Sequence, residues 1–412
     1  MRRIILVCAL VLFGTMPIRA QYPDKQAFQT VEHGRYMAWA ADCSACHTAP
    51  GGKLFAGGGS LETPFGTLLA PNITPDQQTG IGGWTDDQFV NAVRNGIGRR
   101  GDHLYPAMPY TYYTKMTRQD VIAIRAFLDT VQPVHNEVHP NQLPFPFNQR
   151  EAMIGWNALY FKPGEFKSDP TKSAEWNRGA YLVEGAEHCG LCHTPKNAMG
   201  GDENNRYVQG SILQNWYAPN LTGNARVGLG DWTVDDIALY LKTGRNRYDI
   251  ASGPMADAVT HSTSHLTDAD LRAIAVYLKS LAPSPAPSQA VSANDPLMQR
   301  GEAIYIDQCA ACHTMGGGGI VGLFPRLSGA PLVQQAQATS LIRVVLSGSR
   351  SVATPGAPTG PAMPSFAWKL SDDEVAAVLT YIRNSWGNVA PAVSAADVGK
   401  MRQTLQLHAN SE

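Results

Sequence analysis

The chain has 412 residues, of which 44% are hydrophobic, and a formal net charge of −1. This length exceeds what one hydrophobic core usually serves, so we expect several domains. Without residues 1–20 there remain 30 basic and 34 acidic residues, and the resulting charge of −4 argues against a nucleic-acid partner. No later segment has the eighteen uninterrupted apolar residues of a membrane span, which leaves peripheral attachment or attachment through a partner open.

Residues 1–20 are typical of a secretory signal peptide. A basic start is followed by ten apolar residues, Ile4–Phe13, and Ala20 ends a cleavage site. Cys8 lies inside the apolar run and is removed with it, so six cysteines remain. We therefore expect the mature chain in a bacterial periplasm, peripheral on the periplasmic face of the cytoplasmic membrane.

All six remaining cysteines lie in three copies of the pattern Cys-x-x-Cys-His. Composition alone predicts roughly 0.003 such patterns in this chain, so coincidence is excluded. In this pattern two thiols bind a c-type haem covalently and the histidine becomes an axial ligand of its iron. The predicted covalent ligands are Cys43, Cys46, Cys189, Cys192, Cys309 and Cys312, and the predicted axial histidines are His47, His193 and His313.

Zinc and disulfides are the alternatives to haem. A closed zinc site needs four protein ligands, whereas each cluster offers three and no cysteine is left elsewhere. A disulfide across a two-residue gap closes a small strained ring, and it would not explain a histidine behind every second cysteine. The sequence therefore predicts three covalently bound haem c cofactors. No thiol remains for a structural disulfide or a lipid anchor.

Internal repetition divides the chain into three helical units. Each motif follows a segment with glycine and tyrosine, and each unit ends in a helix with an aromatic residue in matching register. Glycine would let these two helices cross closely. The first segments contain Gly34 and Tyr36, Gly179 and Tyr181, and Gly301 and Tyr305, and the closing helices contain Phe127, Tyr277 and Tyr381.

The repeats predict an all-α fold of three tandem helical haem domains joined by linkers, and these domains resemble class I cytochrome c domains. We expect domain 1 at 21–140, an apolar and proline-rich linker at 141–175, domain 2 at 176–283, a Pro/Ser linker at 284–296, domain 3 at 297–388 and a C-terminal tail at 389–412. The first linker contains Met153, Ile154, Trp156, Leu159, Tyr160 and Phe161. We expect these side chains to pack between domains, with contact to a membrane surface or partner subunit as the alternative.

The first two units resemble each other more than the third. The segment Ala70-Pro71-Asn72-Ile73-Thr74 matches Ala218-Pro219-Asn220-Leu221-Thr222. Thr85 and Thr233 are predicted N-caps of matching helices, each with acidic residues in the following turn. The third unit has Phe324-Pro325-Arg326-Leu327 instead, and a later helix near residues 340–347.

Each iron needs a sixth ligand, and methionine is the thioether that pairs with histidine in electron-transferring cytochromes. Met108, Met255 and Met363 follow their histidines by 61, 62 and 50 residues, each in a proline-containing loop before the closing helix. A single methionine usually fills a core, but the repeated position favours these three as axial ligands. The competing residues are His103, His261 and His265.

Prolines after each motif are candidates for contact with the axial histidine. A backbone carbonyl near the imidazole can accept its Nδ1 proton and fix the ring. Pro71, Pro219 and Pro325 are the candidates, with Ile73, Leu221 and Leu327 over the porphyrin face, and an ordinary turn proline is the alternative.

The order of these motifs resembles the three-haem cytochrome c subunit of membrane-associated bacterial dehydrogenases over essentially the whole mature chain. The matching segments are CxxCH, APNIT, GIGGWT and LYPAMPY, then SAEWNRGAYLVEGAEHCGLCHTP, APNLT and GPMADAVTHS, then CAACHTM and GPAMPSF. That family includes partners of alcohol, aldehyde, gluconate, sorbitol, fructose and flavin-dependent glucose dehydrogenases, and of some molybdenum hydroxylases.

The resemblance implies that a separate catalytic subunit of flavin, quinone or molybdenum type passes electrons through the three haems to ubiquinone or another respiratory acceptor. The chain would then be an electron-transfer subunit without catalysis of its own. A free periplasmic shuttle to a terminal oxidase and a multihaem enzyme such as a peroxidase are the alternatives. Some family members carry a C-terminal hydrophobic anchor; this tail offers only Val398, Met401 and Leu405 at helical spacing, enough for docking and too little to span.

Overall fold

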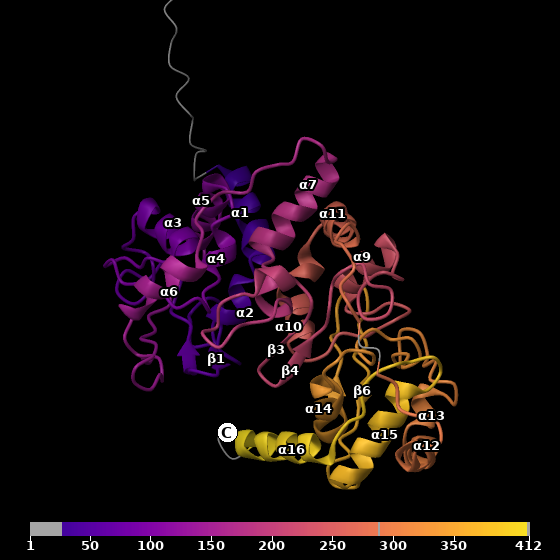
Figure 1. Ribbon diagram of the computed structural model, residues 1–412. Helices are drawn as coiled ribbons and strands as arrows, with labels where there is room; N and C mark the ends of the chain where they lie inside the picture. Colours follow the sequence, from indigo (N-terminus) through magenta and orange to yellow (C-terminus); the bar gives the residue numbers. More distant parts are fainter. Residues whose placement is uncertain (1–26, 287–288, 410–412) are drawn as a thin grey trace, which may run out of the picture.

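The computed structural model describes residues 27–286 and 289–409, and it is mostly helical (Figure 1). The predicted signal peptide, with Cys8, lies outside these residues. Three helical units follow one another along the described chain, each with a short two-stranded antiparallel hairpin. In Figure 1 the first two units lie side by side, and the third, in orange and yellow, lies below them. The all-α fold expected from the sequence did not include these hairpins.

The first unit contains both the first motif and the linker helix that follows. Its elements are α1 (Phe28–Ala40), α2 (Cys43–His47), β1 (Ser60–Thr63), β2 (Gly66–Leu69), α3 (Asp86–Asn95), α4 (Tyr110–Tyr113) and α5 (Arg118–Leu128), followed by the linker helix α6 (Ala152–Tyr160). The chain then enters the second unit.

The second unit repeats this order with extra turns. Its elements are α7 (Ala174–Tyr181), the π-helical turn η1 (Leu182–Ala186), α8 (Cys189–His193), the 3-10 turn η2 (Asn204–Arg206), β3 (Ser211–Leu213), β4 (Trp216–Ala218), α9 (Val234–Thr243), α10 (Pro254–His261), the 3-10 turn η3 (Thr263–His265) and α11 (Asp268–Lys279). The predicted caps are confirmed, because the Thr85 and Thr233 hydroxyls accept the amides of Gln88 and Asp236 at 3.2 and 3.0 Å.

In the third unit the hairpin occurs at a different place in the order of elements. Its elements are α12 (Pro296–Gln308), α13 (Ala310–His313), α14 (Thr339–Ser347), β5 (Ser349–Arg350), β6 (Ala362–Met363), α15 (Asp372–Asn384) and α16 (Ala395–Ala409). In the first two units the hairpin precedes the proline segment, whereas here its second strand contains the predicted axial methionine, Met363. The expectation that this unit differs is therefore confirmed, as is the helix near residues 340–347.

Glycine lets the first and last helices of each unit touch through their backbones, as the sequence predicts. A Cβ atom on Gly34 would lie 1.8 Å from the carbonyl oxygen of Ala123. The same atom on Gly179 would lie 1.9 Å from the oxygen of Ala273, and on Gly301 2.2 Å from that of Ala377. Helix pairs α1–α5, α7–α11 and α12–α15 thus pack at distances that no larger residue permits.

The first two units share one hydrophobic core, in which residues such as Met37, Ile124, Leu182 and Ile274 are at most 3% exposed. The third unit has a core of its own. Helix α16 belongs to it, since Val398 and Met401 are buried there and Leu405 packs against it. The apolar stripe predicted for docking therefore packs on its own unit. Among the described residues, no helix combines the length and apolar character needed to cross a membrane.

The linker helix α6 joins the first two units. Trp156 is buried and donates its indole N–H to the carbonyl of Met199 at 2.9 Å. Asn157 accepts the Tyr110 hydroxyl at 2.7 Å. These contacts confirm that part of the linker packs between units. Ile154 and Leu159 instead are 57% and 72% exposed, so the alternative of an outside contact stays open for that face.

Two tyrosines cross between the first units in a reciprocal arrangement. Tyr36 of α1 donates to Asp270 of α11 at 2.5 Å, and Tyr181 of α7 donates to Asp120 of α5. Each carboxylate also binds a basic side chain of its own unit: His33 lies 2.6 Å from Asp120, and Arg178 binds Asp270 through two nitrogens. Each unit thus contributes one tyrosine and one aspartate to an equivalent pair of contacts across the interface.

Removing either tyrosine hydroxyl should weaken this interface. We expect Tyr36→Phe and Tyr181→Phe each to lower the free energy of unfolding of the joined units by about 1.5–3 kcal/mol, because each loses a bond to a charged acceptor. Tyr248→Phe, which loses an exposed bond to the backbone carbonyl of Asp231, is the control and should cost about 1 kcal/mol or less. Calorimetric unfolding of the variants measures the difference, and equal effects of all three would contradict the interface role.

The same carboxylates should make the interface acid-sensitive. Burial raises the pKa of Asp120 and of Asp270, but their hydrogen-bond partners outweigh it and hold both pKa values below the ordinary 3.8. A depressed carboxylate pKa stabilises the fold above the unfolded value, and this stabilisation is lost as the pH falls through the folded value. Stability should therefore drop below about pH 4, and a melting series against pH should show a smaller drop for Asp120→Asn.

Candidate functional site

The three motifs form short helices that present both thiols and the histidine together. Helices α2 and α8 contain whole motifs, and α13 begins one residue after Cys309. All six cysteines are free thiols in the structure. Burial raises the pKa of Cys46, Cys192 and Cys309 to about 11, so these thiols are protonated when nothing is bound to them. Within residues 27–286 and 289–409, no three His, Cys, Asp or Glu side chains converge as a metal ion would need.

Each motif histidine is fixed by a proline carbonyl, as the sequence predicts. The Nδ1 atoms of the histidines lie 2.7, 2.6 and 2.9 Å from the carbonyl oxygens of Pro71, Pro219 and Pro325. A carbonyl oxygen can only accept, so Nδ1 carries the proton and Nε2 is left free for iron. Burial lowers the pKa of His193 to about 4 and also lowers that of His47 and His313, which keeps all three imidazoles neutral. The residues therefore fit a haem in each unit.

A glycine brings the proline segment close to the motif. The amides of Gly57, Gly210 and Gly319 donate to the carbonyls of the three motif histidines at 2.8, 2.8 and 3.0 Å. All three glycines have positive φ. A Cβ atom on Gly57 would lie 2.6 Å from the carbonyl carbon of Pro71, and one on Gly319 would lie 2.7 Å from that of Pro325. This approach is needed for the histidine–proline hydrogen bond, and the sequence interpretation did not include these glycines.

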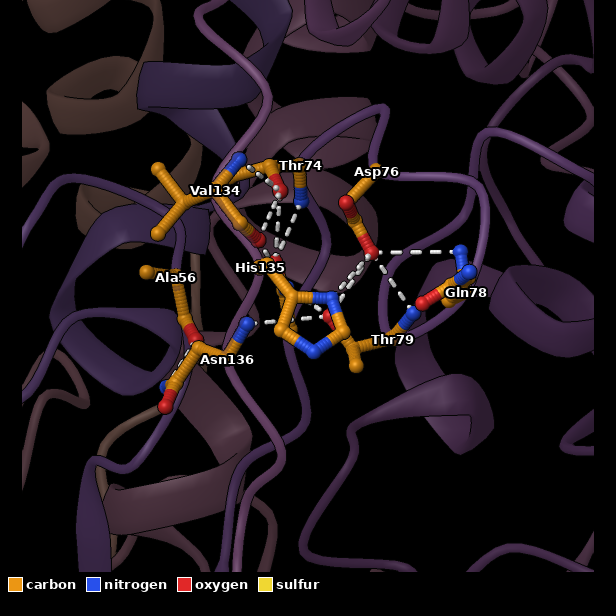
Figure 2. Close-up of polar contacts among 9 residues, drawn as sticks. Ala56, Thr74, Asp76, Gln78, Thr79, Val134, His135 and Asn136 are labelled. Carbon is orange, nitrogen blue, oxygen red and sulfur yellow. Dashed lines mark hydrogen bonds and ion pairs between the residues drawn. The ribbon is translucent and has the colours of Figure 1, made fainter.

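An asparagine next to the proline holds the first of these segments. Asn72 donates its amide to the carbonyl of Val134 at 2.7 Å and accepts the Thr74 amide at 2.9 Å. Figure 2 shows how residues of this loop meet the segment that returns after α5. There the side-chain amide of Asn136 donates to the carbonyl of Ala56 at 2.7 Å, and its backbone N–H donates to the Thr79 hydroxyl at 3.0 Å. The returning segment therefore fixes the loop that contains Pro71.

The second unit has the same arrangement, whereas in the third unit the asparagine lies on the segment that follows α15. Asn220 donates to Ser284, the first residue of the predicted Pro/Ser linker, and accepts the Thr222 amide at 2.7 Å. In the third unit Asn388 donates to the carbonyl of Leu327 at 2.9 Å and accepts the Gly329 amide at 2.8 Å. Sequence reasoning missed this role, although Asn72 and Asn220 stand at the same place in the repeated segment.

We expect Asn220→Ala to destabilise the second unit by about 2–3 kcal/mol, because the buried partners of this amide lose their bonds. A spectroscopic signal of the bound haem should also become heterogeneous, since Pro219 is the next residue. Thermal unfolding and the absorption spectrum measure the two effects. Asn148→Ala, at an exposed position, is the control and should change stability by about 0.5 kcal/mol or less. A similar change in both variants would contradict a specific role.

The three candidate methionines are all half-buried, each beside a different cluster of apolar side chains. Met108 packs against the shared core, Met363 against the third core, and Met255 against a small cluster between the second and third units. Their ligation of iron stays a prediction. Two of the competing histidines have other contacts: His265 stacks on Trp39 at 4.6 Å, and His103 lies 3.4 Å from the Asn157 amide.

One buried polar atom fits the acidic edge of a haem. The indole nitrogen of Trp232 is buried and has no hydrogen-bond partner among the described residues. An unpaired buried donor is costly, and a haem propionate would supply an acceptor. Trp232 precedes the N-cap of α9, in the segment that repeats Gly83-Trp84-Thr85 of the first unit.

The first and second sites adjoin each other. Helix α2 packs against α10, and the Cys46 thiol lies close enough to Cys192 to interact with it electrostatically. Tyr112 of α4 reaches the second motif, since a Cβ atom on Gly190 would lie 2.8 Å from its hydroxyl. Two motifs from distant parts of the chain thus meet at the contact between the first two units.

Comparisons with known proteins agree with this arrangement. The cytochrome c family profile matches residues 31–132, 177–282 and 298–386, one match around each motif. The chain is 40% identical to the gluconate 2-dehydrogenase cytochrome c subunit of Pantoea cypripedii, over 98% of this chain and 96% of that protein. It is 40% identical to the cytochrome c subunit of the quinone-type alcohol dehydrogenase of Gluconobacter oxydans, over 91% and 82%, and 35% identical to the fructose dehydrogenase cytochrome subunit of Gluconobacter japonicus, over 95% and 87%. The resemblance drawn from the sequence and the three haem c sites are confirmed.

Proposed function

Because the chain belongs to the cytochrome c family and carries three haem c groups, we propose that it is the electron-transfer subunit of a dehydrogenase complex. The observation that carries the proposal is the threefold repetition of a motif histidine bound to a proline carbonyl, at 2.6–2.9 Å. Each haem supplies one-electron oxidation and reduction. The protein holds the imidazole of each motif histidine in one orientation.

The proposal includes the axial set His47–Met108, His193–Met255 and His313–Met363, and the six thioether cysteines. With both axial positions filled, no iron is left open for a substrate, which separates this function from that of a peroxidase. We also propose that the three units are class I cytochrome c domains with the boundaries predicted from the sequence. The contact between the first and second motifs supports electron passage between their haems.

The partner is proposed to be a catalytic dehydrogenase subunit of flavin, quinone or molybdenum type. The relatives support this, because their names describe them as cytochrome c subunits of gluconate, alcohol and fructose dehydrogenases. Electrons would pass to ubiquinone or another respiratory acceptor. The exposed apolar residues Phe145, Ile154 and Leu159 support a peripheral position on the periplasmic face of the membrane.

The test is to purify the tagged chain from gently solubilised membranes of its native host and to identify what co-purifies with the haem absorbance. A large flavin-, quinone- or molybdenum-binding subunit whose substrate reduces the haems supports the proposal. A monomer in the soluble periplasmic fraction contradicts it and favours a free shuttle to a terminal oxidase. High-spin haem with peroxide turnover would favour a multihaem enzyme instead.

A further inference from the structure

The third unit inserts its hairpin beside a methionine of the second unit. Strands β5 and β6 pair Ser349 with Met363, so Met363 stands at the base of this hairpin. Val352, in the loop of residues 351–361 that joins the two strands and forms the hairpin tip, is 7% exposed and packs with Val259 and Met255 of the second unit. One hairpin therefore touches the proposed ligand segments of two different haems.

Arg245 of the second unit binds this hairpin and a second loop of the third unit. One guanidinium nitrogen donates to the carbonyl of Gly322 at 2.7 Å. The other donates to the carbonyls of Ala357 and Thr359, both at 2.6 Å. Charge-assisted bonds of this length are among the stronger ones in proteins. A single side chain thus joins two segments that are distant in the sequence.

Both of these segments lead directly to the third haem site. The loop with Gly322 is closed by mutual backbone bonds of Ile320 and Phe324, and Pro325, the acceptor of His313, comes next. Thr359 lies four residues before Met363, in the part of the hairpin that leads into β6. Arg245 therefore holds the segment behind the histidine and the segment before the methionine.

Close contacts at both ends of the hairpin leave its backbone little room to move. A Cβ atom on Gly244 would lie 2.0 Å from Cγ1 of Val352, so the two units touch at the tip. At the base, a Cβ atom on Gly348 would lie 2.6 Å from the carbonyl oxygen of Met363. A shift of the tip would consequently move the base or the second unit.

We propose that Arg245 is a positioning residue that, through the β5–β6 hairpin, links the ligand segments of the second and third haems. It holds the Met363 strand in place from the second unit, and the hairpin tip in turn confines Met255. This inference rests on the axial set of the proposed function. Its consequence is that loosening one contact weakens two methionine–iron bonds and leaves the first haem unchanged.

The test uses imidazole, which competes with methionine for ferric haem, and the near-infrared sulfur-to-iron band as readout. Arg245→Leu is made in a Met255→Ala background, where the band reports the first and third haems, and in a Met363→Ala background, where it reports the first and second. We expect about half of the remaining band in each background to be lost at about tenfold lower imidazole concentration. Arg245→Lys, which keeps one charged donor, should show an intermediate shift.

Gln334→Ala is the matched control, because it removes a bond to the carbonyl of Arg226 at the same interface, away from the ligand segments. It should leave imidazole binding unchanged. If Arg245→Leu does not fold, Val352→Ala replaces it and should shift the second haem. No shift in either background, or a shift of the third haem alone, overturns the link. If Met255→Ala or Met363→Ala leaves the band intact, the axial assignment fails instead, which separates the two proposals.

Discussion

A Gly301→Ala variant is expected to unfold the third unit well below the temperature at which the other two unfold. Alanine favours a helix interior by about 1 kcal/mol over glycine, so helix propensity alone predicts a gain. The added Cβ, however, would lie 2.2 Å from the carbonyl oxygen of Ala377 and 2.7 Å from the Cβ of Tyr381. Neither atom can move without separating α12 from α15. We expect a net loss of about 3 kcal/mol or more, because overpacking here displaces backbone.

Calorimetry can resolve this loss because the third unit has its own core. For a domain of its size the transition should fall by about 12 °C or more, while the joined first and second units keep theirs. Gly155→Ala is the matched control. It makes the same change inside helix α6, where a Cβ atom would meet nothing within 4 Å, and it should stabilise slightly. A third-unit transition that stays in place would show that α12 and α15 can separate at little cost.

Local sequence signals predicted the parts of the site that depend on nearby residues. The motif cysteines and histidines, the helix caps at Thr85 and Thr233, and the proline acceptors all lie in segments that repeat in the chain. Repetition makes these predictions possible from a single sequence. A residue type that occurs at the same place in two or three units is expected to have the same structural role in each. The glycine crossings were predicted for the same reason.

The remaining features depend on partners that the sequence does not identify. Asn72 and Asn220 were visible in the repeats, but their partners Val134 and Ser284 lie about sixty residues away. The three hairpins were missed because their strands have two to four residues, too short for an alternating pattern. The bonds of Tyr36 and Tyr181 cross between units, so neither unit alone contains the reason for its tyrosine.

These cross-unit contacts accompany the hydrophobic core that the first two units share and the third does not. Gly34 and Gly179 are both followed two residues later by a tyrosine that binds the other unit, whereas Ala303 stands at that place after Gly301. Tyr305 instead binds the carbonyl of Thr314 within its own unit at 2.6 Å. The third unit is instead attached by contacts that include Arg245, the hairpin, α14 and Gln335, whose side-chain amide donates to the carbonyl of Val227 at 2.5 Å.

Replacing Met363 by histidine is expected to lower the midpoint potential of one haem by a few tenths of a volt, within the roughly 0.8 V range that axial ligands control. Methionine stabilises ferrous iron more than a second imidazole does, so the change favours the ferric state. Met363 lies half-buried on β6 against the third core, where an imidazole of similar reach can be held. The sulfur-to-iron band should lose about a third of its intensity, since three methionines are proposed to contribute.

A potentiometric titration of the whole chain measures this shift, because the midpoint potential of one haem falls while those of the other two stay in place. Met199→His is the control, because Met199 is 58% exposed and is not a proposed ligand. The same experiment at Met108 and Met255 should move one haem each, so that three substitutions together assign three potentials to three sites. If Met363→His leaves every potential and the band unchanged, another residue ligates the third iron. The order of potentials obtained this way also shows whether an electron at equilibrium resides on the joined units or on the third.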